Sequence, residues 1–402
     1  MTINIPANVN FILTTLQNHG HTGFIVGGCV RDALMGVSPT DWDITTSATP
    51  VEVKALFART IDTGLQHGTV TVLIDKTPYE VTTYRIDGQY IDGRRPLSVE
   101  FVTDIVADLS RRDFTMNAIA YSPSTGFVDP FHGQVDINQR RICCVGDPVH
   151  RFGEDALRML RAIRFSATTG FSVCHHVERA IGMLAQHIAQ VSPERIRVEL
   201  GKLLQGKNPA AAALLYHTGL LATIIGRNTT PPKETWAQTL EWIAKCPPVE
   251  AMRLALFFHW AREGVAQMLR ALRFENALVK ETAHYVALLF EGIPTTDYHL
   301  KKWLRHIPKN MVENIFTLHT IVHPQNIPAI HLAQENLKQI KATNGCYTLK
   351  DLAINGRHLA QMGLSQGQEI GEALELLLDF VLQHPEKNEK EVLENHWRQI
   401  SL

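Results

Sequence analysis

The strongest constraint on the fold of this chain is a change in its hydrophobic pattern near residue 147. Before that point the sequence predicts four strands, at residues 23–26, 42–46, 69–74 and 79–84. The polar segment 75–78 predicts a hairpin turn between the last two. After it the sequence predicts helices, over residues 151–167, 192–204, 249–261, 265–290 and 368–382. We therefore expect an α+β fold, with a mixed N-terminal domain followed by helical domains.

Composition limits the classes of protein that need to be considered. The length of 402 residues predicts two to four domains, and 45% hydrophobic with 20% charged residues is typical of globular proteins. The net charge of −1 means that any nucleic-acid binding must rely on local basic patches. The six cysteines are scattered without a C-x-x-C pair, so we expect neither a disulfide framework nor a zinc site: Cys29, Cys143, Cys144, Cys174, Cys246 and Cys346.

The sequence contains no signal for membrane insertion or secretion. No apolar run reaches 18 residues, and the first residues lack the basic and apolar regions of a signal peptide. Together with the scattered cysteines, this makes the cytoplasm the default expectation.

A glycine pair, Gly27 and Gly28, lies between the first predicted strand and a helix predicted over residues 28–35. Because glycine has no side chain, the backbone there can approach a phosphate, and the helix start offers free N–H groups. Arg31, about one turn further on, could contact the same anion. A simple tight turn also explains the pair, which is neither a Walker loop nor a G-x-G-x-x-G fingerprint.

Two aspartates, Asp41 and Asp43, follow shortly after this turn. Residues i and i+2 of a strand point to one face, so both carboxylates could reach one ion. Magnesium prefers oxygen ligands of this kind and completes its shell with water and substrate phosphates. Glu80, on the strand predicted at residues 79–84, is the best candidate for a third carboxylate. The alternative is a solvated turn.

Two further clusters carry charge at helical spacing. In residues 110–120, Arg111 and Arg112 could bind phosphates, Asp113 could accept from a ribose hydroxyl, and Asn117 adds a polar contact; a charged helix start is the alternative reading. In residues 154–165, Asp155 and Arg158 are expected to be surface neighbours on a helix, and the same three-residue step continues to these residues: Arg161 and Arg164. A solvated ion-pair ladder is the alternative there.

In this order the four motifs resemble those of the class II tRNA nucleotidyltransferase and bacterial poly(A) polymerase family. The resemblance continues through residues 192–197 and into residues 351–356 and 363–371, so it covers nearly the whole chain. In length and layout the chain is most similar to the compact bacterial CCA-adding members. The resemblance implies a polymerase-β-like nucleotidyltransferase head at 1–147, a helical neck at 148–206, a helical body at 207–310 and a tRNA-binding helical tail at 311–402.

The resemblance also implies activity and site residues. The activity is template-independent addition of CCA to the 3′ end of tRNA from CTP and ATP, with Mg2+ as cofactor and no membrane partner; a homodimer is left open. Asp41 and Asp43 would bind the metal, and Glu80 would support that site. The nucleotide-binding residues implied are Gly28, Arg31, Arg112, Asp155, Arg158, Arg161 and Arg164.

An aspartate–arginine pair has a clear logic for base choice. Cytosine and adenine both present an amine donor beside a ring nitrogen acceptor, which Asp155 and Arg158 could satisfy. Uracil and guanine invert this order and would leave groups unpaired, at about 1–3 kcal/mol each. Loss of discrimination in Asp155→Ala is the expected result of this hypothesis.

Several rival functions share part of these motifs. A poly(A) polymerase, a CC-only or A-only enzyme, a non-catalytic tRNA-binding protein and a small-molecule nucleotidyltransferase are the alternatives. The loop at residues 85–101, with Arg94, Arg95 and Pro96, looks complete, which favours full CCA addition. Candidate RNA contacts are individually weak: Lys301, Lys302, Trp303, Arg305, Lys338, Lys341 and residues 363–367.

Overall fold

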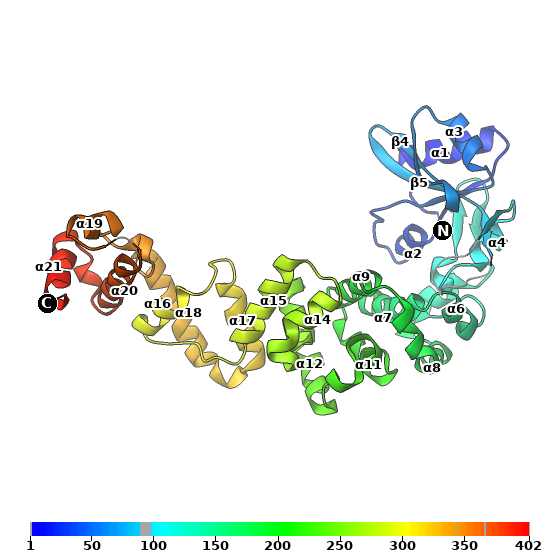
Figure 1. Cartoon of the computed structure of the whole chain (residues 1–402). Coiled ribbons are helices and arrows are strands. Elements are labelled where there is room, and N and C mark those ends of the chain that lie inside the picture. Colours follow the sequence, from blue (N-terminus) through cyan, green and yellow to red (C-terminus); the bar gives the residue numbers. More distant parts are fainter. Residues whose placement is uncertain (1, 89–97, 344, 366, 402) are drawn as a thin grey trace. The chain divides into compact units, whose positions relative to one another are not determined.

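A computed structural model describes residues 2–88, 98–343, 345–365 and 367–401 of the chain (Figure 1). The chain forms two compact units. The N-terminal unit comprises Met1–Ala244 and Gln267–Asn276, and the C-terminal unit comprises Lys245–Ala266 and Ala277–Leu402. The finer division into head, neck, body and tail stays a prediction, and so does the loop containing Arg94 and Arg95, which lies outside the described residues.

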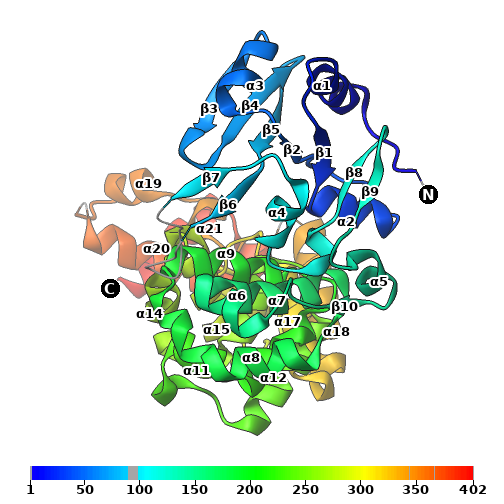
Figure 2. The ribbon, with the colours of Figure 1, turned by 90° about the vertical axis from the view of Figure 1, so that its right-hand side faces the viewer.

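A seven-stranded sheet organises the first part of the N-terminal unit (Figure 2). Its strands are, in spatial order, β3 (Thr60–Gly64), β4 (Thr69–Ile74), β5 (Thr77–Thr83), β2 (Ile44–Thr46), β1 (Gly23–Val26), β8 (Ala120–Ser122) and β9 (Gly126–Val128). Only β2 and β5 run parallel to each other; the other neighbours are antiparallel. The four predicted strands and the hairpin are confirmed, although β2 starts two residues later and β5 two residues earlier than expected.

Helices and a small second sheet complete this part of the unit. The helices are α1 (Ala7–Asn18), α2 (Gly28–Leu34), α3 (Pro50–Leu56), α4 (Ile105–Ser110) and α5 (Gly133–Asn138). The second sheet pairs β6 (Arg85–Asp87) with β7 (Val99–Phe101). The predicted start of α3 is confirmed: Glu52 accepts from the backbone N–H of Thr49 at 2.7 Å, Thr49 Oγ1 accepts from the backbone N–H of Glu52, and Pro50 takes the first position.

The two faces of the sheet have different roles. Ile25, Ile44 and Val81 lie side by side in register on one face, which α1 and α3 cover with their own apolar residues. On the other face Phe24 packs with Leu109 of α4. Side chains alternate between the two faces of a sheet along each strand. Asp43 lies just before β2 and two residues before Thr45, which is paired with Phe24. Asp43 therefore belongs to the same face as Phe24. Both faces thus contribute to apolar cores, and the second face also carries the polar residues of interest.

The rest of the N-terminal unit is mainly helical. Its elements are α6 (Pro148–Glu154), α7 (Leu157–Thr169), α8 (His175–Leu184), α9 (Pro193–Leu204), α10 (Ala213–His217), α11 (Leu220–Ile225), α12 (Lys233–Lys245) and a parallel pair of short strands, β10 (Arg141–Ile142) and β11 (Ser172–Val173). The helix predicted over residues 192–204 is confirmed by α9. The single helix predicted over residues 151–167 is wrong, because Asp155 has extended backbone angles, φ −145° and ψ 104°, and separates α6 from α7.

Helices make up the C-terminal unit. They are α13 (Glu250–Phe257), α14 (Val265–Ala271), α15 (Asn276–Leu288), α16 (Asp297–Leu304), α17 (Val312–Val322), α18 (Ile327–Ala342), α19 (Gly356–Gln361), α20 (Gln368–Gln383) and α21 (Lys390–Ile400), with α14 and the start of α15 shared with the N-terminal unit. The continuous helix predicted over residues 265–290 is wrong, because the chain turns at Arg273, which has a φ of +61°. The core around α20 joins Leu377, Leu378 and Val381 to Leu359 of α19.

Two expectations about chain chemistry have different outcomes. The expected lack of disulfides is wrong, since Cys143 and Cys174 are joined by a disulfide bond. The remaining four cysteines are free and buried. Within the described part of the chain, no helix has the length and apolar character needed to cross a membrane.

Candidate active site

The Gly27–Gly28 turn brings the polar face of the sheet close to α2. Gly27 has a φ of +81°, and a Cβ atom at this position would lie 3.1 Å from Nη1 of Arg112. Glycine is therefore required both by the backbone conformation and by the arginine above it. Gly28 begins α2, and a Cβ there would lie 3.8 Å from Nη2 of Arg31. The turn predicted to bind phosphate thus lies beneath two guanidinium groups, which is a suitable place for a polyphosphate.

Asp41 and Asp43 lie in the connection between α2 and β2 rather than within the strand. The backbone carbonyl of Asp43 accepts from the N–H of Val26 at 3.0 Å, which fixes Asp43 beside the glycine turn. Both residues are exposed, and neither carboxylate forms an ion pair with the described residues. Partial burial raises the pKa of the Asp43 carboxyl, Arg112 opposes this, and the charge of Asp41 adds to it. Two carboxylates that interact with each other and form no ion pair among the described residues suit a bound cation.

Glu80 is related to Asp41 and Asp43 only by the backbone pairing of β5 with β2. Val81 of β5 pairs with Ile44 of β2 in parallel, so Glu80 lies one step along the same register as Asp43. However, the oxygens of Asp41, Asp43 and Glu80 do not converge within 4.8 Å of one another; among the described residues only a different group does so. The structure therefore supplies Asp41 and Asp43 as two carboxylates whose charges interact, and the role of Glu80 stays a prediction.

A buried aspartate that the sequence reading missed holds Arg111 and Arg112. Asp108 on α4 is 0% exposed, and its carboxylate lies 2.8 Å from Arg111 and 3.4 Å from Arg112. Its other contacts are Thr45 Oγ1 of β2 and the backbone N–H of Arg85. Burial alone would raise the pKa of Asp108, but the two arginines hold it below its usual value. The i, i+3 and i, i+4 spacing was the available signal.

A chain of hydrogen bonds joins α2 to the helices after residue 148. Arg31 donates to Asn117 at 2.7 Å, Asn117 donates to Asp113 at 3.1 Å, and Arg161 of α7 donates to Asp113 at 2.8 Å. Burial would raise the pKa of Asp113, but Arg161 and Asn117 hold it at about 2. Both oxygens of Asp113 are used inside the protein, so the expected contact with a ribose hydroxyl is not supported. Glu199 of α9, also missed, extends the chain.

Three of the predicted arginines lie around the aromatic ring of Phe165 on α7. The guanidinium carbons of Arg164, Arg31 and Arg161 lie 3.5, 5.1 and 5.5 Å from its centroid. Arg164 also donates to Glu199 at 2.8 Å. Cation–π contacts and ion pairs of this kind fix the arginines in place. Gly28, Arg31, Arg161 and Arg164 are therefore brought into one continuous region.

Asp155 and Arg158 do not form the neighbouring pair that the sequence predicted. Asp155 lies between two helices, where it accepts from Arg195 at 2.7 Å and from the backbone N–H of Leu157 at 3.0 Å. Arg158 turns instead to Glu154 and to the backbone carbonyl of Arg111. The premise of a shared helical face is wrong because the helix breaks at Asp155, and each side chain is positioned by other protein groups.

The fold and the motifs around the glycine turn are those expected of a nucleotidyltransferase of the poly(A) polymerase class. In agreement, the Poly A polymerase head domain profile matches residues 23–143. A profile named for an RNA- and SrmB-binding site of polymerase A matches residues 170–227, and a tRNA nucleotidyltransferase domain 2 profile matches residues 249–396.

Whole-chain similarity narrows this class further. The chain is 37% identical over 383 residues to a CCA-adding enzyme of Geobacillus sp., covering 94% of this chain and 93% of the relative. A CCA-adding enzyme of Anoxybacillus flavithermus is 38% identical over 388 residues, covering 95% and 94%. The chain belongs to the family of CCA-adding enzymes.

Solved structures agree with this assignment. The Bacillus stearothermophilus CCA-adding enzyme in complex with CTP superposes with a TM-score of 0.81, 33% identity and 98% coverage of both chains. The Thermotoga maritima CCA-adding enzyme complexed with tRNA_CCA gives a TM-score of 0.72 with 20% identity and 100% coverage of both chains, which supports the fold alone. The predicted α+β architecture with helical domains after the head is confirmed.

Proposed function

We propose that this chain adds C, C and A in turn to the 3′ end of tRNA, using CTP and ATP and releasing pyrophosphate. The observation that carries this proposal is whole-length similarity to CCA-adding enzymes, one of them solved with CTP, combined with the carboxylate pair beside the glycine turn. In each cycle the terminal hydroxyl of the RNA attacks the α-phosphate, and the bond to pyrophosphate breaks.

The donor set at the glycine turn fits a magnesium ion. Asp41 and Asp43 offer hard oxygen ligands, and the pKa of Asp43 is raised first by burial and then by the charge of Asp41, both of which a bound cation would offset. When bound there, magnesium would supply Lewis-acid polarisation of phosphate oxygens and a lower pKa for a hydroxyl. We assign Glu80 a supporting role near this site, on the strength of its register with Asp43.

The arginines of the chain would bind the triphosphate. Arg112 and Arg31 lie next to the Gly27–Gly28 turn. Asp108 holds Arg112, and Asp32 and Asn117 hold Arg31, but these partners do not use every N–H group of either guanidinium. Planar guanidinium groups suit phosphate oxygens because they donate two parallel hydrogen bonds. Positioning by fixed partners reduces the entropy lost when the nucleotide binds.

Asp155 and Arg158 are proposed to recognise the base, although each side chain is held in place by different protein groups. A carboxylate has about four lone-pair sites, so Asp155 keeps capacity for a base amine while Arg195 holds it in place. Arg158 must direct a donor away from Glu154 to reach a ring nitrogen. The test is primer extension with UTP and GTP: Asp155→Ala should relax discrimination, and unchanged discrimination would remove Asp155 from this role.

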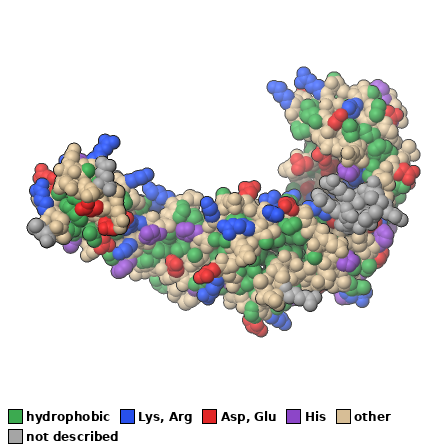
Figure 3. All heavy atoms as spheres, in the orientation of Figure 1, with side chains coloured by type: hydrophobic (Ala, Val, Ile, Leu, Met, Phe, Trp, Pro, Cys, Tyr) green, Lys and Arg blue, Asp and Glu red, His purple; other side chains and the backbone are tan. Residues whose placement is uncertain are grey.

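The C-terminal unit is proposed to hold the tRNA, with Arg357 rather than the predicted lysine patch as a contact. Lys301, Lys302 and Arg305 are ion-paired, and Lys301 is buried. Figure 3 shows basic and acidic side chains interspersed over the visible face of this unit. In the second predicted basic pair, Lys338 and Lys341, one of the two charges is neutralised, because Lys341 forms an ion pair with Glu313.

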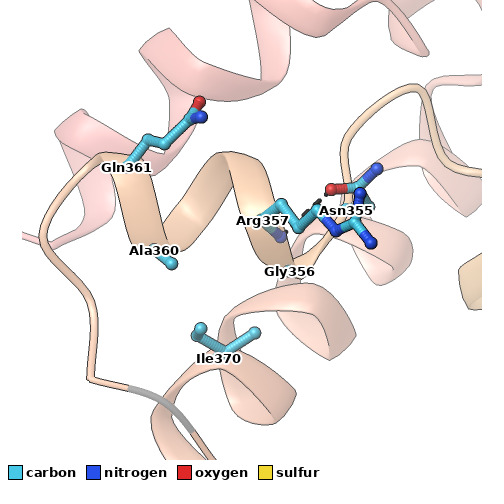
Figure 4. A pocket seen from close by; sticks show the side chains of 6 residues that line it. All are labelled: Asn355, Gly356, Arg357, Ala360, Gln361 and Ile370. Carbon is cyan, nitrogen blue, oxygen red and sulfur yellow. Dashed lines mark hydrogen bonds between the residues drawn. The ribbon is translucent and has the colours of Figure 1, made fainter.

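Arg357 lies at an open pocket between α19 and α20 (Figure 4). The lining residues are Asn355, Gly356, Arg357, Ala360, Gln361 and Ile370. Asn355 caps α19 by accepting from the backbone N–H of Arg357 at 3.0 Å, and Ile370 projects toward α19. Arg357 is exposed and forms no ion pair within the described residues, so it is available to a phosphate. The predicted phosphate contact at residues 363–367 stays a prediction, because residue 366 lies outside the described residues.

The outcomes of one extension assay separate the proposal from its rivals. A tRNA ending at the discriminator base is incubated with CTP, with ATP, or with both, and products are resolved to single nucleotides. CCA addition predicts two additions with CTP alone and three with both. Long adenosine tails would indicate a poly(A) polymerase, arrest after CC or addition of A only would indicate a partial enzyme, and no product would indicate a silent tRNA-binding protein.

We place this activity in the cytoplasm, where the tRNA precursor and both nucleotides are present. The proposal requires no homodimer, because every residue of the site comes from one chain. Sedimentation equilibrium at assay concentrations measures the oligomeric state directly.

A further inference from the structure

Cys143, Cys174 and His176 form a cluster that includes none of the residues proposed to bind the nucleotide or the magnesium ion. Cys143 and Cys174 are disulfide-bonded, and a ring nitrogen of His176 lies within 4.8 Å of both sulfurs. Among the described residues this is the one group of three or more cysteine, histidine or acidic side chains whose ligand atoms lie that close together.

The backbone places the three residues together independently of the bond. Ile142 of β10 pairs in parallel with Val173 of β11, so the next residues on each strand, Cys143 and Cys174, are neighbours, with Cα atoms 5.6 Å apart. The N–H of Cys174 donates to the carbonyl of Ile142 at 3.1 Å. His176 follows in the first turn of α8. Reduction of the disulfide would therefore leave both thiols in place.

Accessibility distinguishes this pair from the other cysteines. The other four are free and buried, whereas Cys143 and Cys174 are partly exposed. His176 is exposed, lines an open pocket with Asp147 and Arg179, and makes no hydrogen bond or ion pair within the described residues. A solute can thus reach both sulfurs and the imidazole.

We propose that Cys143, Cys174 and His176 form a redox-controlled site for a thiophilic divalent cation such as Zn2+. Two thiolates and an imidazole are typical zinc ligands, and tetrahedral coordination leaves the fourth position for water. The sulfurs cannot be both bonded to each other and ligated, so the oxidised chain excludes the metal and the reduced chain binds it.

The redox step exchanges one disulfide for another. The two thiols reduce one glutathione disulfide to two glutathione molecules, which carry away two electrons and two protons, and the protein disulfide forms. Either the bond or the metal closes the same loop, with a sequence separation of 31 residues. That loop contains α6, α7 and the candidate base-choosing residue Asp155. The reduced, metal-free chain alone lacks this cross-link.

Cobalt titration of the full chain tests the site by spectroscopy. Protein reduced with a phosphine and kept anaerobic is titrated with Co2+, which replaces Zn2+ and gives a thiolate-to-cobalt absorption band. We expect about one equivalent bound by the band, displacement by Zn2+, and no band after oxidation by glutathione disulfide. Cys174→Ser should abolish the band, and His176→Ala should weaken binding at least about tenfold.

The neighbouring exposed residue provides a matched control, since His175→Ala should leave the titration unchanged. Zn2+ should also raise the thermal midpoint of the reduced wild type but not of Cys174→Ser. Absence of the band in reduced wild type, or equal binding in all three variants, would overturn the proposal. Cobalt held by Asp41 and Asp43 gives no thiolate band, so this result is independent of the outcome of the nucleotide-addition assay.

Discussion

Replacing Asp113 by asparagine tests how the strand-rich part of the N-terminal unit is joined to α7. The side chain of Asp113 is 10% exposed and accepts from Arg161, Asn117 and the backbone N–H of Phe114. Asparagine keeps the shape but removes the charge and places an amide against the guanidinium of Arg161. That arginine would retain Glu199, at 3.5 Å, as an ion-pair partner, together with its contact with the Phe165 ring.

The magnitude follows from the shift in the pKa of Asp113, from 3.8 to about 2. At about 1.36 kcal/mol for each pKa unit, ionised Asp113 contributes about 2–3 kcal/mol to the free energy of unfolding at pH 7. Since the folded pKa is depressed, this contribution is present above the unfolded pKa and is lost as pH falls through the folded one. About half of this contribution should remain at pH 3. Arg161 is 32% exposed, so we expect no larger penalty for its lost partner.

Urea unfolding at pH 7 and pH 3, followed by circular dichroism, measures these differences. The matched control is Asp104→Asn, because Asp104 is an exposed N-cap of α4 and asparagine caps equally well. We expect a loss of about 2–3 kcal/mol for Asp113→Asn at pH 7, about half of that at pH 3, and little change in the control. A loss below about 0.5 kcal/mol, or one of equal size at both pH values, would refute this electrostatic account.

Three further predictions concern activity. Asp43→Asn should lower the rate of nucleotide addition by at least about a thousandfold. It should leave the thermal midpoint of the protein unchanged or slightly raised, because the raised pKa of Asp43 shows that its charge is unfavourable without metal. A large loss of stability in this variant would contradict the prediction. At limiting magnesium, wild-type activity should fall as the pH is lowered, starting at pH values above those at which an aspartate ordinarily titrates, and should recover when magnesium is increased. A loss of activity at low pH that does not depend on the magnesium concentration would contradict the metal assignment. Arg357→Ala should raise the KM for tRNA several-fold without changing kcat, whereas Lys302→Ala, which removes an already paired lysine, should change neither.

Sequence reasoning was most accurate where a local signal decided the outcome. The Thr49 cap, the hairpin around residues 75–78 and the glycine turn each depend on residues close in the chain, and all are found as predicted. The break at Asp155 was missed because α6 and α7 keep a helical apolar pattern on both sides of it, while the long-range pair with Arg195 holds it extended.

Contacts that depend on tertiary structure had weaker signals in the sequence. Asp108 had a helical spacing to Arg111, but nothing in the sequence showed that it would be buried beneath Thr45. Glu199 had no signal, since its partners lie 35 and 38 residues away. The disulfide was missed because Cys143 and Cys174 become neighbours only through the pairing of two strands of two residues each.

Sequencing of product ends under competition tests the central claim most directly. A tRNA ending at the discriminator base is incubated with magnesium and equal concentrations of all four nucleoside triphosphates, and the added 3′ nucleotides are read for single molecules. The account predicts that nearly all extended molecules end in CCA and grow no further. Extension with U or G, adenosine tails, or no extension at all would contradict it.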